Sequence, residues 1–237
     1  MRSCRPPLFW KRKFEPQVIV TCVRWYLRFC LSLRDLEDLM AERGLSVDHT
    51  SIWRWIQAYG PEVNRRLQGA VKPKSSTWHI DETFVRIAGK WMYLFRAVDA
   101  HSQTVDFYLS ETRDREAAKL FLKRALANAD NRPPHVFARD GLRSYPAAIR
   151  ELQAEAHVRG RCQQRTRRYC NNRIESDHRH VKRRLRAMQG PRTAATAWVM
   201  IQGIEAAQMI RKGQVLGITR SNLHGQAWVF AALLGLQ

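Results

Sequence analysis

The chain has 237 residues, 45% of them hydrophobic, which is enough for one large folded domain or for a medium domain and a small one. It carries 41 Lys and Arg against 21 Asp and Glu, a formal net charge of +20 at pH 7. Such a charge indicates a polyanionic partner, first of all nucleic acid. Basic ribosomal and chromatin proteins rarely contain eight Trp residues, so the composition favours a folded enzyme that processes DNA or RNA.

The five cysteines form no C-x-x-C pair and no zinc-finger spacing, so we expect the reduced thiols of a cytoplasmic protein, one that is nucleoid-associated when bound to DNA. No apolar stretch of signal-peptide length, about 7 to 15 residues, follows the basic N-terminus. The apolar tail 228–236 is shorter than the roughly 20 residues that span a bilayer. We therefore expect no membrane partner, and a tail that packs as a terminal helix or contacts another subunit.

Residues 16–59 have the periodicity of three helices, which we assign to an N-terminal domain of residues 1–67. Pro16 can begin the first helix, where a missing N–H costs nothing. Ser32 is a suitable N-cap for the second helix, and Gly44 follows its end. Ser46 can cap the third helix, which we expect to run to residue 59 with its apolar side chains on one face.

Two short helices around a glycine-containing turn are typical of a helix-turn-helix, whose second helix enters the DNA major groove. A plain helical hairpin would show the same periodicity. The exposed face of residues 46–59 favours DNA binding, because its side chains form hydrogen bonds and are not the Glu and Lys mixture of a solvated surface. The expected DNA contacts are Thr50, Ser51, Trp53, Arg54 and Gln57.

Residues 68–77 are polar and contain glycine and proline, which predicts a linker. Beyond it, β-branched and aromatic residues predict a meander of three strands. The predicted strands are 78–87, 90–99 and 104–110, and they are followed by a helix over 114–128, a strand over 135–139, a helix over 145–156, a basic loop and a long helix from about residue 171. This order, β-β-β-α-β-α-α, predicts an α/β domain over 78–213 with a mixed sheet flanked by helices. A tail over 214–237, which could be helical, completes the chain.

Three acidic residues fall where this order would bring them together. Asp81 lies inside the first strand, Asp140 follows the later strand, and Glu175 is in the first turn of the long helix. If the two strands are neighbours, Asp81 and Asp140 share one edge of the sheet. Clustered carboxylates repel one another unless a cation lies among them, so they imply a hard divalent ion with oxygen ligands. We expect Asp81, Asp140 and Glu175 to bind Mg²⁺, with Mn²⁺ as a substitute.

Two such ions about 3.5 to 4 Å apart can hold the attacking and leaving oxygens of a displacement at phosphorus. Water as the nucleophile leaves a free 3′-hydroxyl, and the same site can then join that hydroxyl to a second DNA. Each acid also has a structural explanation. Glu175 could have no role beyond complementing the helix dipole, which stabilises a helix by about 0.3 to 1 kcal/mol. Asp140 could be a turn residue. Asp81 lies in an apolar strand and needs a partner, whereas Glu82 points to the opposite face.

The long helix carries a carboxylate followed by cations along one row. Glu175, Arg179, Lys182 and Arg186 have the spacing i, i+4, i+7 and i+11, which suits a metal and then DNA phosphates. Asp177 points about 200° away from Glu175 and is a poor partner for the same site. His178 belongs to the adjacent buried stripe, either behind the metal ligands or as a satisfied core histidine. The basic residues before this helix that we expect along a DNA track include Arg167 and Arg168.

At these residues the chain resembles the bacterial insertion-sequence transposases of the insertion-sequence-six family. The matching stretches are 14–19, 25–28, 33–44, 78–83, 169–179 and 209–214, among them Trp78-His-Ile-Asp-Glu-Thr and Tyr169-Cys-Asn-Asn-Arg-Ile-Glu-Ser-Asp-His-Arg. The family resembles this chain in having two Asp and one Glu, the D-D-E residues, with 34 residues between the second Asp and the Glu. Here the same number separates Asp140 from Glu175, since 175 − 140 − 1 = 34.

The resemblance implies a ribonuclease-H-like (RNase-H-like) catalytic fold, recognition of terminal inverted repeats, transposition through cointegrates and a basic residue seven positions after the Glu, here Lys182. It also implies double-stranded DNA partners, the element ends and the target, and a homo-oligomer in the synaptic complex. Our leading hypothesis is a DNA transposase that cleaves and joins strands. The alternatives are a metal-dependent nuclease or resolvase that never joins, and a helix-turn-helix repressor whose second domain is catalytically dead.

Overall fold

The computed structural model describes residues 5–72, 74–139, 144–158, 160–166, 172–188 and 191–236, apart from the side chain of Arg173. Backbone contacts divide the chain into two compact units. Residues 72–182 form the sheet unit, and residues 1–71 together with 183–237 form the helical unit. The chain therefore leaves the helical unit after α3, builds the sheet unit, and returns within α6.

Five strands of the sheet unit form one mixed sheet in the order β3-β2-β1-β4-β5. The strands are β1 (Thr77–Ile87), β2 (Lys90–Asp99), β3 (Thr104–Ser110), β4 (Val136–Arg139) and β5 (Gln163–Thr166). The predicted meander is confirmed, since β2 pairs antiparallel with both β1 and β3. The predicted neighbourhood of the first and fourth strands is also confirmed, because β1 and β4 pair in parallel.

One strand was missed, because the segment before the long helix was expected to be a loop. β5 pairs in parallel with β4, and its four residues are polar and mostly exposed. A strand of this kind forms through its partner and not through its own side chains, so no apolar alternation reveals it in the sequence. The observed order is β-β-β-α-β-α-β-α.

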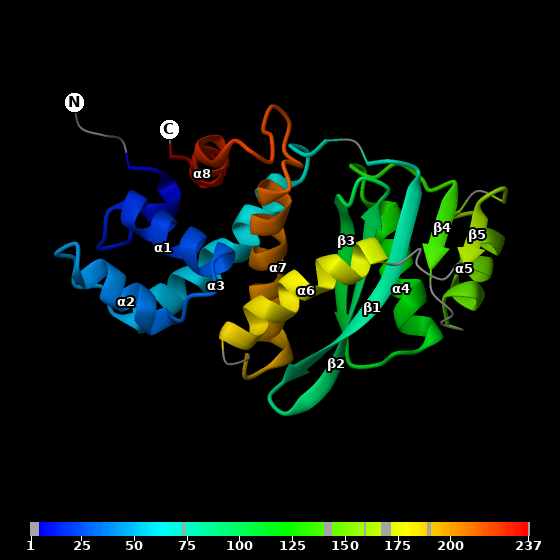
Figure 1. Cartoon of the computed structure of the whole chain (residues 1–237), viewed down its shortest axis with the longest axis horizontal. Helices are drawn as coiled ribbons and strands as arrows, with labels where there is room; N and C mark the ends of the chain where they lie inside the picture. The colour runs from blue at the N-terminus through cyan, green and yellow to red at the C-terminus, as the bar shows by residue number, and fades with distance from the viewer. Residues whose placement is uncertain are drawn as a thin grey trace. The chain divides into compact units, whose positions relative to one another are not determined.

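One face of the sheet carries the hydrophobic core of the unit. Residues of β1 and β2 that alternate along their strands, including Trp78, Ile80 and Phe95, are buried against α4 (Arg115–Ala127) and α5 (Ser144–Ala154). The first turns of α6 (Asn172–Ala187) contact the opposite face, and Figure 1 shows α6 in yellow on one side of the sheet, with α4 and α5 on the other. A mixed sheet with this strand order and helices on both faces has the RNase-H-like arrangement, as predicted.

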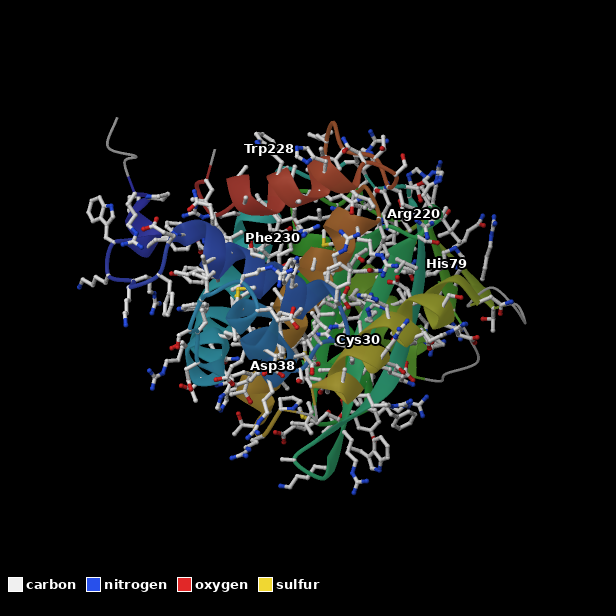
Figure 2. The ribbon with its side chains drawn as sticks, turned by 60° about the vertical axis from the view of Figure 1, so that its left-hand side comes forward. Cys30, Asp38, His79, Arg220, Trp228 and Phe230 are labelled. Atoms are coloured by element: carbon white, nitrogen blue, oxygen red, sulfur yellow. The ribbon has the colours of Figure 1, made fainter. Side chains whose placement is uncertain are left out.

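The helical unit contains α1 (Pro16–Arg28), α2 (Leu33–Ala41), α3 (His49–Leu67), α7 (Ala194–Arg211) and α8 (Leu223–Ala232). Helices α3 and α7 approach closely where two glycines face each other: a Cβ on Gly203 would lie 3.2 Å from the Gly60 Cα. Helix α8 lies in the C-terminal segment, with Phe230 buried and Trp228 exposed on opposite sides in Figure 2. In the described part of the chain, no helix is both long enough and apolar enough to cross a membrane.

The helix starts follow the sequence, with one correction. Pro16 occupies the first turn of α1, and Ser32 caps α2 through a reciprocal pair of hydrogen bonds with Asp35. The N-cap of α3 is Asp48 and not Ser46, because the Asp48 carboxylate accepts a hydrogen bond from the Thr50 N–H at 2.7 Å. The helix also continues past the predicted end to Leu67, since Val63 and Leu67 extend its buried stripe by two turns.

Two further expectations concern the cysteines and the domain boundaries. Cys22, Cys30 and Cys162 are free thiols, and the two remaining cysteines lie outside the described residues. The domain boundaries expected from the sequence stay a prediction. Helix α7 falls within the expected catalytic segment 78–213, and its backbone contacts with α3 and α1 group it with the helical unit.

Candidate active site

Asp81 lies on β1, the central strand, and its side chain is on the face opposite the hydrophobic core. Only 8% of Asp81 is exposed. The residue directly across from it on β2 is Arg96, and residues that face each other in an antiparallel pair project to the same side. Asp81 and Arg96 are therefore neighbours on the α6 face of the sheet, and both are charged and buried there.

The neighbouring strand β4 ends beside this position. Arg139, its last residue, pairs with Ile80, the residue before Asp81. Asp140 follows Arg139 in the sequence, but it lies outside the described residues, as do Arg167 and Arg168. The structure thus places the end of the β4 strand at the expected edge and leaves the second acid of the trio a prediction.

Helix α6 contacts both charged positions on the sheet. The His178 Nε2 atom lies 3.1 Å from Asp81 Oδ2. The Arg96 Nη2 atom donates a hydrogen bond of 2.6 Å to Asp177 Oδ2 on the same helix. Asp177 and His178 are adjacent in the chain, so two consecutive helix residues bind two facing residues of β1 and β2.

The hydrogen bond between His178 and Asp81 is one between a neutral imidazole and a carboxylate. Burial, and then the positive charge of Arg96, lowers the pKa of His178 to about 3, so the ring is uncharged near neutral pH. An uncharged ring can bind an ionised carboxylate only by donating, which places the proton on Nε2. Nδ1 is then an acceptor, and it is buried without a hydrogen-bond partner among the described residues.

The predicted row on α6 is exposed, as the helical spacing requires. Glu175, Arg179, Lys182 and Arg186 are all exposed, whereas Ile174 and Val181 of the adjacent stripe are fully buried. Glu175 precedes His178 by three residues, a spacing at which helical side chains are neighbours, about 5 to 6 Å apart between Cβ atoms. The first turn of α6 therefore carries the exposed carboxylate of Glu175, next to His178, the side chain that contacts Asp81.

Glu82 points to the other face, as its place in the strand predicts. It is buried and forms an ion pair with Arg113. Burial raises the pKa of Glu82, and the Arg113 hydrogen bond partly offsets that rise. Glu82 thus belongs to the core side of the sheet and takes no part in the arrangement around Asp81.

A different acidic group lies at the turn between α2 and α3. Ligand atoms of Glu37, Asp48 and His49 lie within 4.8 Å of one another. Among the described residues, this is the one group of three acidic, histidine or cysteine side chains close enough to hold a metal ion. Its contacts are accounted for by the turn itself, because Asp48 caps α3 and His49 Nδ1 lies 3.0 Å from Glu37 on α2. We read it as a connection between two helices.

The residues expected to contact DNA on α3 differ in exposure. Thr50 and Arg54 are exposed, whereas Ser51, Trp53 and Gln57 are half-buried. Gln57 also donates to the Met200 sulfur on α7 at 3.5 Å, so its side chain turns toward the protein. The N-terminal half of α3 therefore presents fewer free polar groups than the sequence indicates.

The sequence does not predict Arg96 near the site, and it sets Asp177 aside as a partner of Glu175 without predicting its ion pair with Arg96. Arg96 interrupts an apolar strand and is fully buried, which requires an acidic partner. Asp177 has the spacing of the buried stripe, three residues after Ile174 and four before Val181. A buried arginine that needs an acidic partner and an aspartate on the buried stripe of α6 together indicate the pair of Arg96 and Asp177.

The match with a family model gives the class of the protein. A model described as a DDE domain matches residues 75–214. Together with the RNase-H-like sheet, this match defines a polynucleotidyl transferase, an enzyme class that acts on nucleic acid phosphodiesters with divalent metal ions.

Relatives are similar over most of their length. The transposase for the insertion sequence-like element IS431mec of Staphylococcus aureus strain Mu50 is 36% identical over 201 residues, which are 85% of this chain and 87% of the relative. The transposase for insertion sequence element IS257 in transposon Tn4003 of the same species is 35% identical over the same shares. The catalytic core domain of BIV integrase is 16% identical with a TM-score of 0.44 and covers 61% of this chain and 90% of its own.

The chain belongs to the insertion-sequence-six family of D-D-E transposases. The predicted family and the predicted transposase class are thereby confirmed, and neither the non-joining nuclease nor the dead repressor is favoured.

Proposed function

We propose that this transposase binds the terminal inverted repeats of its element and cuts and joins DNA at a site formed by Asp81, Asp140 and Glu175. The observation that carries the proposal is the contact of α6 with Asp81, because it brings the helix that bears Glu175 to the strand edge where β4 ends. Asp140 is the next residue in the sequence after Arg139, the residue of β4 that pairs with Ile80, and its place among the ligands is part of the proposal.

The proposed ligands suit Mg²⁺, or Mn²⁺ in its place. All three supply carboxylate oxygens, which hard divalent cations prefer. Asp81 is nearly buried, and a buried carboxylate gains from a cation beside it. Two bound divalent ions would supply stabilisation of the attacking and leaving oxygens and a lowered pKa for a bound water. Other side chains of the protein would orient these carboxylates and bind the DNA.

His178 orients Asp81 by donating from Nε2, so that one carboxylate oxygen is fixed and the carboxylate cannot rotate freely. The exposed cations Arg179 and Lys182 follow Glu175 along α6 and would bind the phosphates next to the scissile one. In the first step water attacks phosphorus and the 3′-oxygen leaves with a proton. In the second step that 3′-hydroxyl loses its proton and attacks a target phosphodiester, and the 3′-oxygen of the target strand leaves and takes up a proton.

The element ends would be recognised by the helical unit. Helices α2 and α3 around the Gly44 turn have the order of a helix-turn-helix, and the exposed Thr50 and Arg54 are at the end of α3 that such a motif inserts into the major groove. Because a transposition event uses two ends and a target, we expect a homo-oligomer to hold them in one synaptic complex.

The test is strand cleavage and joining with labelled inverted-repeat ends and a plasmid target in Mg²⁺. Asp81→Asn, Asp140→Asn and Glu175→Gln should each lower both activities by about 100-fold or more, because several kcal/mol of charge stabilisation are lost. Binding of the ends in a gel shift should remain. Glu82→Gln, on the opposite face of the same strand, should keep joining. Joining retained by Asp140→Asn would remove that residue from the site.

A further inference from the structure

The first turns of α6 are attached to the sheet by two contacts of different chemistry. Asp177 pairs with Arg96 on β2 at 2.6 Å, and His178 binds Asp81 on β1 at 3.1 Å. All four residues are buried, with exposed fractions of the whole residue between 0% for Arg96 and 8% for Asp81. The two strand residues face each other across the β1 and β2 pair.

Two contacts restrain a helix in a way that one contact cannot. Consecutive helix residues project about 100° apart, so Asp177 and His178 reach the sheet in different directions. The buried Ile174 and Val181 hold α6 on the sheet, but apolar packing is not directional and fixes the rotation of the helix less exactly than hydrogen bonds do. One polar contact to each of two strands therefore restrains both the roll and the slide of the N-terminal part of α6.

Glu175 lies in that same turn, two residues before Asp177 and three before His178. A roll of α6 about its axis would therefore move the Glu175 carboxylate relative to Asp81. Folding stability is a weak explanation for a buried ion pair, since replacing such a pair by apolar residues of similar volume is often neutral or even stabilising. Its geometry is more informative, because the Arg guanidinium fixes direction as well as distance.

We propose that Arg96, Asp177 and His178 act as a positioning clamp that sets where Glu175 stands relative to Asp81. These are positioning residues, since they act through the carboxylates and through α6. The inference rests on the proposed function, in that it takes Asp81 and Glu175 to be metal ligands. It adds that metal affinity depends on a buried ion pair and a histidine that hold no metal themselves.

The variants separate the hydrogen bond from the packing. His178→Gln keeps an N–H that can reach Asp81, whereas His178→Leu fills the space and removes the donor. Asp177→Asn weakens the pair with Arg96 without changing its shape. Glu82→Gln is the matched control, because it makes the same loss of a buried carboxylate paired with arginine, on the core side of β1.

Two readouts are needed in the full-length protein. The first is direct binding of Mn²⁺ alone, which is measured through the electron paramagnetic resonance signal of the free ion. The second is the Mg²⁺ concentration that half-saturates strand transfer, measured apart from the rate at saturation. His178→Leu and Asp177→Asn should weaken Mn²⁺ binding and raise the half-saturating Mg²⁺ about tenfold, as loss of groups that orient metal ligands does. His178→Gln should recover most of the loss, and Glu82→Gln should match the wild type.

A merely structural role predicts something else. Asp177→Asn would then lower the thermal midpoint and the active fraction but leave both metal readouts unchanged, and this result would overturn the clamp. The double variant Arg96→Met with Asp177→Leu covers the case in which single variants fold poorly, because an apolar pair should restore the thermal midpoint. We expect it to keep the raised Mg²⁺ requirement, and a wild-type requirement would also overturn the clamp.

Failure of the clamp and failure of the proposed site are distinguishable. If Asp81→Asn and Glu175→Gln abolish Mn²⁺ binding and joining while the clamp variants keep wild-type metal readouts, only the clamp is wrong. If Asp81→Asn and Glu175→Gln themselves bind Mn²⁺ and join DNA normally, the proposed site is wrong and the clamp fails with it.

Discussion

Glu62 on α3 lies between two arginines of its own helix. Its carboxylate accepts from Arg65 at 2.7 Å and from Arg66 at 2.5 Å, and Arg66 also donates to the Leu233 carbonyl at 3.1 Å. These contacts, led by the Arg65 hydrogen bond, lower the pKa of Glu62 to about 2. Glu62 therefore contributes stability only while it is ionised.

We expect Glu62→Gln to lower the free energy of unfolding by about 1 kcal/mol at pH 7, a modest value because the arginines are partly solvated. A depressed carboxylate pKa stabilises the fold above the unfolded value, about 4.3 for Glu, and loses that effect as pH falls through the folded value. The gap between wild type and Glu62→Gln in urea unfolding should thus close between pH 4.5 and 2. Glu42→Gln, at an exposed position, is the control, and a gap constant down to pH 2 would contradict the expectation.

At the candidate site, the residue types were predictable and their supports were not. Asp81 could be selected because an acid in an apolar strand needs a partner, and Glu82 could be set aside by strand alternation. The partners of a buried charge depend on which helix packs on that face. The contacts of Arg96 with Asp177 and of Asp81 with His178 join residues 81 and 97 positions apart in the sequence. Such pairs are fixed by tertiary packing, for which local periodicity has no signal.

At the scale of elements, the strongly periodic segments were the predictable ones. The meander, α1, α2, α4 and the long α6 follow from alternation, helical spacing and caps. The four-residue β5 has no apolar face, and the N-cap of α3 was placed two residues early because a serine and an aspartate compete for the same role. Helix α7 was overlooked because ten of its residues are buried, so it lacks the polar face that makes a helix visible.

The packing of α7 on α3 gives an element-scale prediction. A Cβ at Gly203 would lie 2.7 and 2.9 Å from the Leu27 methyl groups and 3.2 Å from the Gly60 Cα. Gly203→Ala should therefore destabilise the protein by about 1 to 3 kcal/mol, because a packed core resists an extra methyl group. The measurement is the urea midpoint at pH 7.

Gly60 offers a matched control on the facing helix. A Cβ there would meet its nearest neighbour, the Gly203 Cα, at 3.5 Å, which is ordinary contact. Gly60→Ala should be neutral or stabilising by up to about 1 kcal/mol, since alanine is favoured over glycine inside helices. Equal destabilisation by the two substitutions would show that crowding at Gly203 is not what limits the approach of α3 and α7.

At the scale of the whole molecule, the net charge of +20 makes DNA binding depend on salt. Every phosphate neutralised by Lys or Arg releases condensed counterions, so the logarithm of the binding constant falls with the logarithm of salt concentration by about 0.9 per contact on duplex DNA. The charge sets affinity for any DNA, and it does not choose which cations touch the backbone. Substitution of single cations can make that distinction.

Lys182 is the cation for which helix geometry is most specific, because it is exposed on α6 two turns beyond Glu175. If it binds a phosphate, Lys182→Ala should reduce the magnitude of the salt slope by about 0.9 and weaken binding to all sequences alike. Fluorescence anisotropy of a labelled inverted-repeat duplex at several salt concentrations measures both quantities. Lys123→Ala removes the same charge from the exposed side of α4, on the opposite face of the sheet, and should leave the slope unchanged. Equal slopes for the two variants would mean that Lys182 acts only through the net charge, and the DNA path would then have to be sought away from this row of α6.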